Sequence, residues 1–183
     1  MLADISEFLL RSLTHLIIIV VLLRLYLQLV RANFRNPLAQ AIVQLTSPLV
    51  VPVRRFVPPI GQIDTATLLV AYAIQVVLLA ALFLLRGIDV SGAIFGLAVF
   101  ELARLSLQLF IFAIIINIVL SWVAPGTYNP ASQLIDELVR PILTPFRRWI
   151  PPVSGFDFSP IGALLALGVG TIIVDNLSAW FLY

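Results

Sequence analysis

Cysteine and lysine are absent from this sequence of 183 residues, and histidine occurs once. The lack of cysteine excludes disulfides, thiolate metal sites and thiol catalysis, and a single histidine excludes the common histidine-rich metal sites. Charged residues are scarce, at 11% of the chain, where a soluble domain has roughly 25%. Hydrophobic residues make up 61%, which leaves too little polar surface to cover a globule in water. These proportions indicate an integral membrane protein.

Four apolar stretches are long enough to cross a bilayer, which requires about 20 mostly apolar residues. They cover approximately residues 12–30, 65–85, 105–123 and 160–182. A fifth apolar stretch at 90–100 rises only ~16 Å as a helix. It could be an interfacial helix, a re-entrant helix or the early start of the third span. We therefore expect an all-α polytopic protein with four spans and with both termini on one side.

The basic residues, all of them arginine, indicate the orientation. Four lie in the connection between the first two spans, three lie between the last two, and three lie in the remaining flanks. Loops rich in arginine stay in the cytoplasm. Both connections should therefore be cytoplasmic, with both termini outside. Because the charges are few and lie near membrane boundaries, no contact with nucleic acid is expected.

The two arginine-rich connections repeat each other. Displacing the chain by 93 residues places 36–64 on 129–157 without a gap, and twelve of the 29 positions are identical. Ten of the twelve prolines fall at these paired positions. The sequence therefore predicts a parallel duplication, with one unit at 1–86, a linker at 87–104 and a second unit at 105–183. Each unit would contain a span, an amphipathic surface helix, a Pro/Arg elbow and a second span.

The surface helices have a recognisable start. Asn36 and Asn129 are each followed by proline; asparagine caps the free N–H groups of a helix, and proline is tolerated at the first helical position. We expect these helices to end before Pro48 and Pro141, and the later prolines predict irregular backbone. An apolar stripe on the second helix indicates that it lies at the membrane surface: Leu134, Ile135, Leu138, Val139 and Ile142.

Each elbow carries two adjacent arginines and, ten residues after the first of them, an aspartate: Arg54, Arg55 and Asp64, then Arg147, Arg148 and Asp157. Local ion pairing best explains the aspartates. Two interpretations of the arginines stay open. They could contact lipid phosphates in a stiff turn that sets the topology, or they could form a recognition surface for a partner protein or a specific anionic lipid.

At these residues the chain resembles the YggT family, also called the YlmG family. The resemblance rests on NPLAQAIVQLTSPLVVPVRRFVPPIGQID and NPASQLIDELVRPILTPFRRWIPPVSGFDFSP with the apolar spans around them, and it covers essentially the whole chain. It implies a small multi-pass protein of the bacterial inner membrane, with links to osmotic-stress tolerance, ion uptake and cell division. In plastid relatives it implies links to cytochrome-complex maturation and nucleoid organisation. It supplies no catalytic residues. The first copy ends in GQIDTAT and the second in GFDFSP, so the two copies need not bind the same ligand.

Polar side chains inside a membrane are functional candidates by default, and five lie in the predicted spans: His15, Arg24, Gln108, Asn117 and Asp175. Arg24 either extends to lipid phosphates or marks an interface together with Asn117, its equivalent by offset. Asp175 either pairs with His15 or Arg11 or is solvated at the outer interface. Gln108 is expected to join helices. Gly162, Gly168 and Gly170 predict a face for close helix packing or dimerisation.

Two functions compete. No catalytic, cofactor-binding or metal-ligating motif occurs, so the first is a non-enzymatic scaffold or assembly factor. It would support membrane integrity or osmotic-stress tolerance through elbows that bind anionic lipid headgroups or a membrane-protein partner. The second is a component of an ion transporter or channel, which would need to oligomerise because four spans are few for a pore. A water-filled path lined by Arg24, Asn117 and Asp175 would favour transport.

Overall fold

The computed structural model describes residues 2–123, 129–150 and 157–181. Within them the chain is helical and has no named strand, and its elements are α1 (Leu2–Leu29), α2 (Pro37–Arg54), α3 (Thr65–Leu85), α4 (Ala93–Val123), α5 (Pro130–Trp149) and α6 (Ser159–Phe181). Helices α1, α3, α4 and α6 are each long and apolar enough to cross a membrane. The expected fold class, an all-α polytopic membrane protein with four candidate spans, is confirmed.

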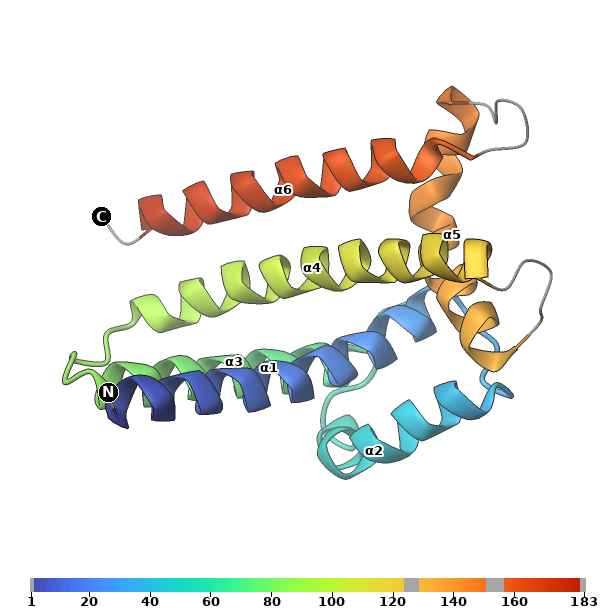
Figure 1. Cartoon of the computed structure of the whole chain (residues 1–183). Helices are drawn as coiled ribbons and strands as arrows, with labels where there is room; N and C mark the ends of the chain where they lie inside the picture. Colours follow the sequence, from blue (N-terminus) through green and yellow to red (C-terminus); the bar gives the residue numbers. More distant parts are fainter. Residues whose placement is uncertain (1, 124–128, 151–156, 182–183) are drawn as a thin grey trace.

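The four long helices run along one common direction (Figure 1). α1 packs on α3, α4 packs on α6, and α3 and α4 join the two pairs. Both chain termini lie at one end of this bundle, and α2 and α5 lie at the other end. Each half of the chain therefore has the same order of elements, a long helix, a shorter helix at one end of the bundle and a second long helix.

The core forms where the two halves meet. Ile18, Val21 and Leu22 of α1 are almost completely buried, and they belong to one cluster with Leu105 and Leu109 of α4. α6 is the least covered helix, and its buried residues are confined to its first turns. The apolar side chains that α6 leaves exposed suit contact with lipid.

The third span begins earlier than its sequence suggested. α4 is one continuous helix of 31 residues, about 46 Å long, so residues 93–100 are its first turns and not a separate interfacial or re-entrant helix. Glu101 and Arg104 lie inside this helix and form an ion pair with each other one turn apart, at 2.9 Å. Ile94 and Leu97 are buried beside Leu79 of α3, which holds the early part of α4 against its neighbour.

The expectation that the two shorter helices end before their first internal proline is wrong. α2 continues through Pro48 and Pro52, and α5 continues through Pro141 and Pro145. In each helix the two prolines are four residues apart and exposed, so the carbonyl groups that lose their amide partners lie on the outer face, where water or headgroups can satisfy them. The opposite face is anchored in the core, for example by the fully buried Leu143.

The starts of these helices are as expected. The Asn36 side chain accepts a hydrogen bond from the Leu38 amide at 2.9 Å, and Asn129 forms a capping box with Ser132. The Asn36 side-chain amide also donates to the Pro130 carbonyl at 2.6 Å, which joins the first turns of α2 and α5. The apolar stripe of α5 faces the protein core, since Leu134, Leu138 and Val139 are buried.

Candidate functional site

The first elbow (residues 54–64) is closed by an ion pair between a partly exposed arginine and a buried aspartate. Arg54 at the end of α2 contacts Asp64, whose side chain is 1% exposed and caps α3. Asp64 also accepts hydrogen bonds from the Thr67 hydroxyl at 2.6 Å and the Thr67 amide at 3.3 Å. Burial alone would raise the pKa of Asp64, but the hydrogen bonds from Thr67 and Arg54 and the arginine charge outweigh it and hold the pKa below its ordinary value.

The second elbow (residues 147–157) repeats this pair in a more open form. Arg147 Nε donates to Asp157 at 2.9 Å, and the two side chains are 42% and 37% exposed. Asp157 also accepts from the Ser159 amide at the start of α6, at 2.9 Å. Burial raises the pKa of Asp157 less than the bonds from Ser159 and Arg147 lower it, so it too lies below its ordinary value. Pro151 and Pro152 lie outside the described residues.

The second arginine of each pair is left free. Arg55 and Arg148 are exposed, and no hydrogen bond or ion pair joins either side chain to another described residue. Each is followed by an exposed aromatic residue, Phe56 at 85% exposure and Trp149 at 79%. We call Arg55–Phe56 and Arg148–Trp149 the two anchor pairs. The sequence pattern contained both, but only the geometry separates the free arginine from the ion-paired one.

The backbone that carries the first anchor pair is well held. The Thr65 hydroxyl donates to the Pro58 carbonyl at 2.6 Å, and Ile60 and Ile63 bond to each other across a short turn. Gly61 in this turn has φ of +60°, a conformation that glycine adopts without strain. The first elbow is therefore an ordered turn that closes on the start of α3.

Arg24 joins α1 to α2 inside the protein. Its side chain is 5% exposed, and its guanidinium donates to the Thr46 hydroxyl at 2.9 Å, with longer contacts of 3.4 Å to α2. It therefore does not extend to lipid phosphates. Asn117 is half-buried and has no hydrogen bond within the described residues, and Val139 takes the place of Thr46 at the same offset. The two positions do not mark equivalent interfaces.

The structure forms no ion pair between Asp175 and His15 or Arg11 among the described residues, and of the two alternatives for Asp175 the exposed side chain fits the solvated one. Asp175 is exposed and lines a cavity of about 190 Å³ together with Glu101 and Arg104. Arg11 instead lies 3.7 Å from Glu7. The reason is helix order: α6 packs on α4 and has no contact with α1, so charges at a similar depth on α1 and α6 cannot meet.

Other helix contacts also differ from the expected ones. Gln108 is exposed and forms no hydrogen bond to another described helix, so it does not join helices here. Gly162 lies close to Phe146 and Gly170 to Leu107, whereas Gly168 faces open space. The tightest glycine contact was not predicted: a Cβ on Gly96 would lie 2.2 Å from the Phe181 ring. Gly96 thus lets α6 approach α4 at the end of the bundle that carries the termini.

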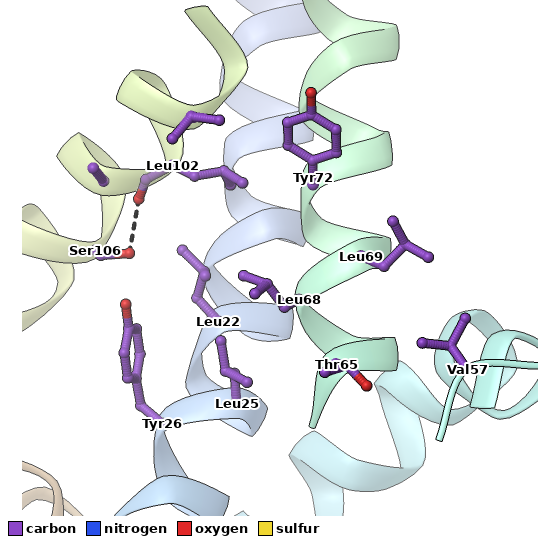
Figure 2. Close-up of a pocket in the computed structure, with 12 residues that line it drawn as sticks. Leu22, Leu25, Tyr26, Val57, Thr65, Leu68, Leu69, Tyr72, Leu102 and Ser106 are labelled. Atoms are coloured by element: carbon purple, nitrogen blue, oxygen red, sulfur yellow. Dashed lines mark hydrogen bonds between the residues drawn. The ribbon is translucent and has the colours of Figure 1, made fainter. Parts of the chain in front are cut away.

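The larger cavities are apolar grooves. The one between α1, α3 and α4 has a volume of about 560 Å³ and is lined by residues such as Leu22, Leu68 and Tyr72 (Figure 2). A second of about 620 Å³ lies beside α4 and α6, and a third of about 410 Å³ beside α1 and α3. None of these three cavities, nor the polar one at Asp175, is lined by Arg24 or Asn117.

The comparison with known families agrees with this architecture. A family model described as CCB3/YggT matches the chain twice, over residues 3–85 and 96–178. The chain belongs to the CCB3/YggT family. The two matched ranges are displaced by 93 residues, the offset at which the two elbows align, and the suspected family is confirmed.

Two of the following relatives match nearly the whole chain, and the third matches about a third of it. A Pseudomonas aeruginosa protein described as uncharacterised is 46% identical over 176 residues, which is 94% of this chain and 89% of the relative. The Escherichia coli K12 protein YggT, also uncharacterised, is 35% identical over 88% of this chain and 85% of its own length. A chloroplastic YlmG homolog of Arabidopsis thaliana matches 61 residues at 41% identity, 32% of this chain and 23% of its own. No solved structure matches.

Proposed function

We propose that this YggT-family chain is a non-enzymatic scaffold or assembly factor of the bacterial inner membrane that holds anionic lipid headgroups at its two anchor pairs. The observation that carries the proposal is the division of roles within each arginine pair. Arg54 and Arg147 are neutralised by Asp64 and Asp157. The neighbouring arginines keep their charge free for an external anion.

The chemistry of the anchor pairs suits a lipid surface. An arginine guanidinium binds phosphate through parallel N–H bonds, and exposed aromatic rings favour the level of the headgroups. α2 and α5, at whose C-terminal ends the anchor pairs lie, are at the same end of the bundle (Figure 1), so both anchor pairs can contact one leaflet. The positive-inside rule makes that leaflet the cytoplasmic one, where anionic lipids attract basic residues by about 1 kcal/mol per arginine.

Such a protein would contribute to osmotic-stress tolerance by tying its bundle, and any membrane protein bound to it, to the charged leaflet. No partner protein needs to be invoked for the anchor pairs themselves. A protein partner at the elbows would instead require acidic groups to reach Arg55 and Arg148.

The test uses purified protein in nanodiscs that contain phosphatidylcholine with a small share of phosphatidylglycerol. Wild-type protein should enrich phosphatidylglycerol in its annulus. Arg55→Gln with Arg148→Gln should weaken that preference by roughly 30-fold, as about 2 kcal/mol implies. The matched control, Arg31→Gln with Arg35→Gln, removes two exposed charges that belong to no anchor pair and should keep most of the preference. Equal loss in both double variants would refute the anchor pairs.

Orientation has its own test, because the chain has no cysteine. A single cysteine in place of Gln62, in the first elbow, should react with a membrane-impermeant maleimide only after the cells are opened. A cysteine in place of Asp89, at the opposite end, should react in intact spheroplasts. The reverse pattern would place the anchor pairs on the outer leaflet and contradict the proposal.

Ion transport by an oligomer is a second candidate, and one observation favours it. The cavity at Asp175 also holds Glu101 and Arg104, and Arg104 Nε is buried there without a partner in the described residues. Purified protein in liposomes should then conduct an ion, and Asp175→Asn should reduce the flux. Absence of flux at any protein-to-lipid ratio would reject this candidate and leave the scaffold.

A further inference from the structure

The groove between α1, α3 and α4 runs from the first elbow along the bundle. Val57 of the elbow and Thr65 at the start of α3 line one end, and Tyr72 lies toward the other (Figure 2). Tyr72 lies seven positions after Thr65 in α3, which corresponds to about 10 Å along the helix axis. The groove is therefore elongated parallel to the direction in which lipid chains lie in a bilayer.

The groove is apolar and open to the outside. Leucines supply much of its wall, and Leu68, Leu69 and Val99 are 43%, 43% and 55% exposed. The Ser106 hydroxyl is already satisfied by the Leu102 carbonyl at 2.7 Å, and the Tyr72 hydroxyl by the Phe95 carbonyl at 3.0 Å. The Thr65 hydroxyl donates to the Pro58 carbonyl, and the Tyr26 hydroxyl lies beside Ser106 (Figure 2). Because the remaining lining side chains are hydrocarbon, an acyl chain fits the groove.

An arginine lies near the elbow end of this groove, although it is not one of the lining residues. Arg55 precedes Val57 by two residues, a backbone separation of at most about 7 Å, and its side chain has no partner among the described residues. Arg54 cannot serve because Asp64 neutralises it. The other two large grooves differ: one is lined by Ile142 of α5 and the other by Leu49 of α2, and neither is lined by a described residue of the elbows.

We propose that this groove binds one acyl chain of an anionic phospholipid whose phosphate is held by Arg55. The proposal rests on the proposed headgroup binding by the anchor pairs and adds a lipid held at one place, beside the first elbow only. Charge complementarity at the elbow end selects an anionic lipid over a zwitterionic one. The lipid would fill the space between α3 and α4 and so join the two halves of the chain.

Native mass spectrometry of detergent-solubilised protein, titrated with phosphatidylglycerol or with phosphatidylcholine of the same acyl chains, tests this proposal. Wild-type protein should retain one phosphatidylglycerol, about fivefold more tightly than phosphatidylcholine. Arg55→Gln should remove that fivefold difference. Leu69→Trp should fill the groove and release the lipid. Two matched controls should bind as wild type: Arg35→Gln, and Leu165→Trp on the exposed face of α6.

A second readout does not depend on the bulky variant folding. Leu69→Cys, in a chain otherwise free of cysteine, can carry a fluorophore. Phosphatidylglycerol with brominated chains should quench it more strongly than brominated phosphatidylcholine, whereas a label at Leu165→Cys should show no difference.

Three results would overturn the proposal. Retention of the lipid by Leu69→Trp would show that the acyl chain does not lie in the groove. In that case, weaker binding by Arg55→Gln would still support the headgroup role of Arg55. Equal retention of the two lipids by wild-type protein would remove Arg55 as the headgroup ligand. A change from oligomer to monomer in Leu69→Trp, with lipid binding unchanged, would show that a second copy of the chain fills the groove.

Discussion

The two aspartates that close the elbows offer a matched pair within one chain, and replacing each with alanine should have unequal effects. Asp64 is 1% exposed, caps α3 and holds both Arg54 and the Thr67 hydroxyl. Its loss removes a helix cap worth about 1 kcal/mol and a charge-assisted hydrogen bond worth about 2 kcal/mol. Asp64→Ala should therefore lower the free energy of unfolding by about 3 kcal/mol.

Asp157→Ala should cost about 1 kcal/mol. Its ion pair with Arg147 is more than a third exposed, where solvent leaves such a pair worth ~0.5 kcal/mol, and the remaining loss is its bond to the Ser159 amide. The difference between the two variants, about 2 kcal/mol, is the quantity that the geometry predicts.

Chemical unfolding in mixed detergent micelles, followed by the fluorescence of the three tryptophans, measures both values. Double-mutant cycles with Arg54→Ala and Arg147→Ala would separate the ion pair from the helix cap. The first cycle should give a coupling energy well above 1 kcal/mol and the second one below it. Equal costs for Asp64→Ala and Asp157→Ala would refute the idea that burial of the Asp64 carboxylate makes the first pair the stronger one.

Three further predictions concern single side chains. The pKa of Asp64 in the folded protein lies below its unfolded value of about 3.9. Its contribution to the free energy of unfolding is therefore complete at neutral pH and is lost as the pH falls through the folded-state pKa. Unfolding measured between pH 7 and pH 3 should show a smaller loss of stability for Asp64→Asn than for wild type. Thr46→Val should destabilise the chain by about 1–2 kcal/mol because it leaves Arg24 buried without its closest acceptor. Arg24→Met should be nearly neutral, since Thr46 keeps its bond to the Ile42 carbonyl. A larger loss of stability for Arg24→Met than for Thr46→Val in an unfolding assay would contradict this account. Gly87→Ala should cost about 1 kcal/mol although nothing lies within 4 Å, because φ is +66° there, and a melting temperature equal to wild type would disprove it.

The second span shows where local sequence was sufficient. Its predicted limits, 65–85, coincide with α3, because both ends carry a polar residue with a defined chemical role: Asp64 caps the first turn and Arg86 ends the apolar run. The capping asparagines of α2 and α5 were found for the same reason. In these places the residue that specifies a helix end lies within a few residues of that end.

The errors have a common physical cause. Proline destabilises a helix interior locally, but Pro48 and Pro141 are tolerated because the opposite faces of α2 and α5 are buried by residues distant in sequence. The third span, expected at 105–123, also includes residues 93–104, because Glu101 and Arg104 neutralise each other one turn apart in α4. In both cases the outcome depended on partners that hydropathy does not encode.

The sequence alone was sufficient to predict a membrane protein, the number of candidate spans, the repeated elbow and the family. Composition, the length of apolar runs and a 93-residue offset are properties of the chain itself. Only the tertiary structure decided how each arginine pair divides its roles. Arg54 and Arg55 are adjacent and chemically identical, yet Asp64 lies within reach of one and not of the other. It also decided that Asp175 lies beside α4 and away from His15, because pairing at a given depth requires neighbouring helices, and helix order is a property of the folded bundle.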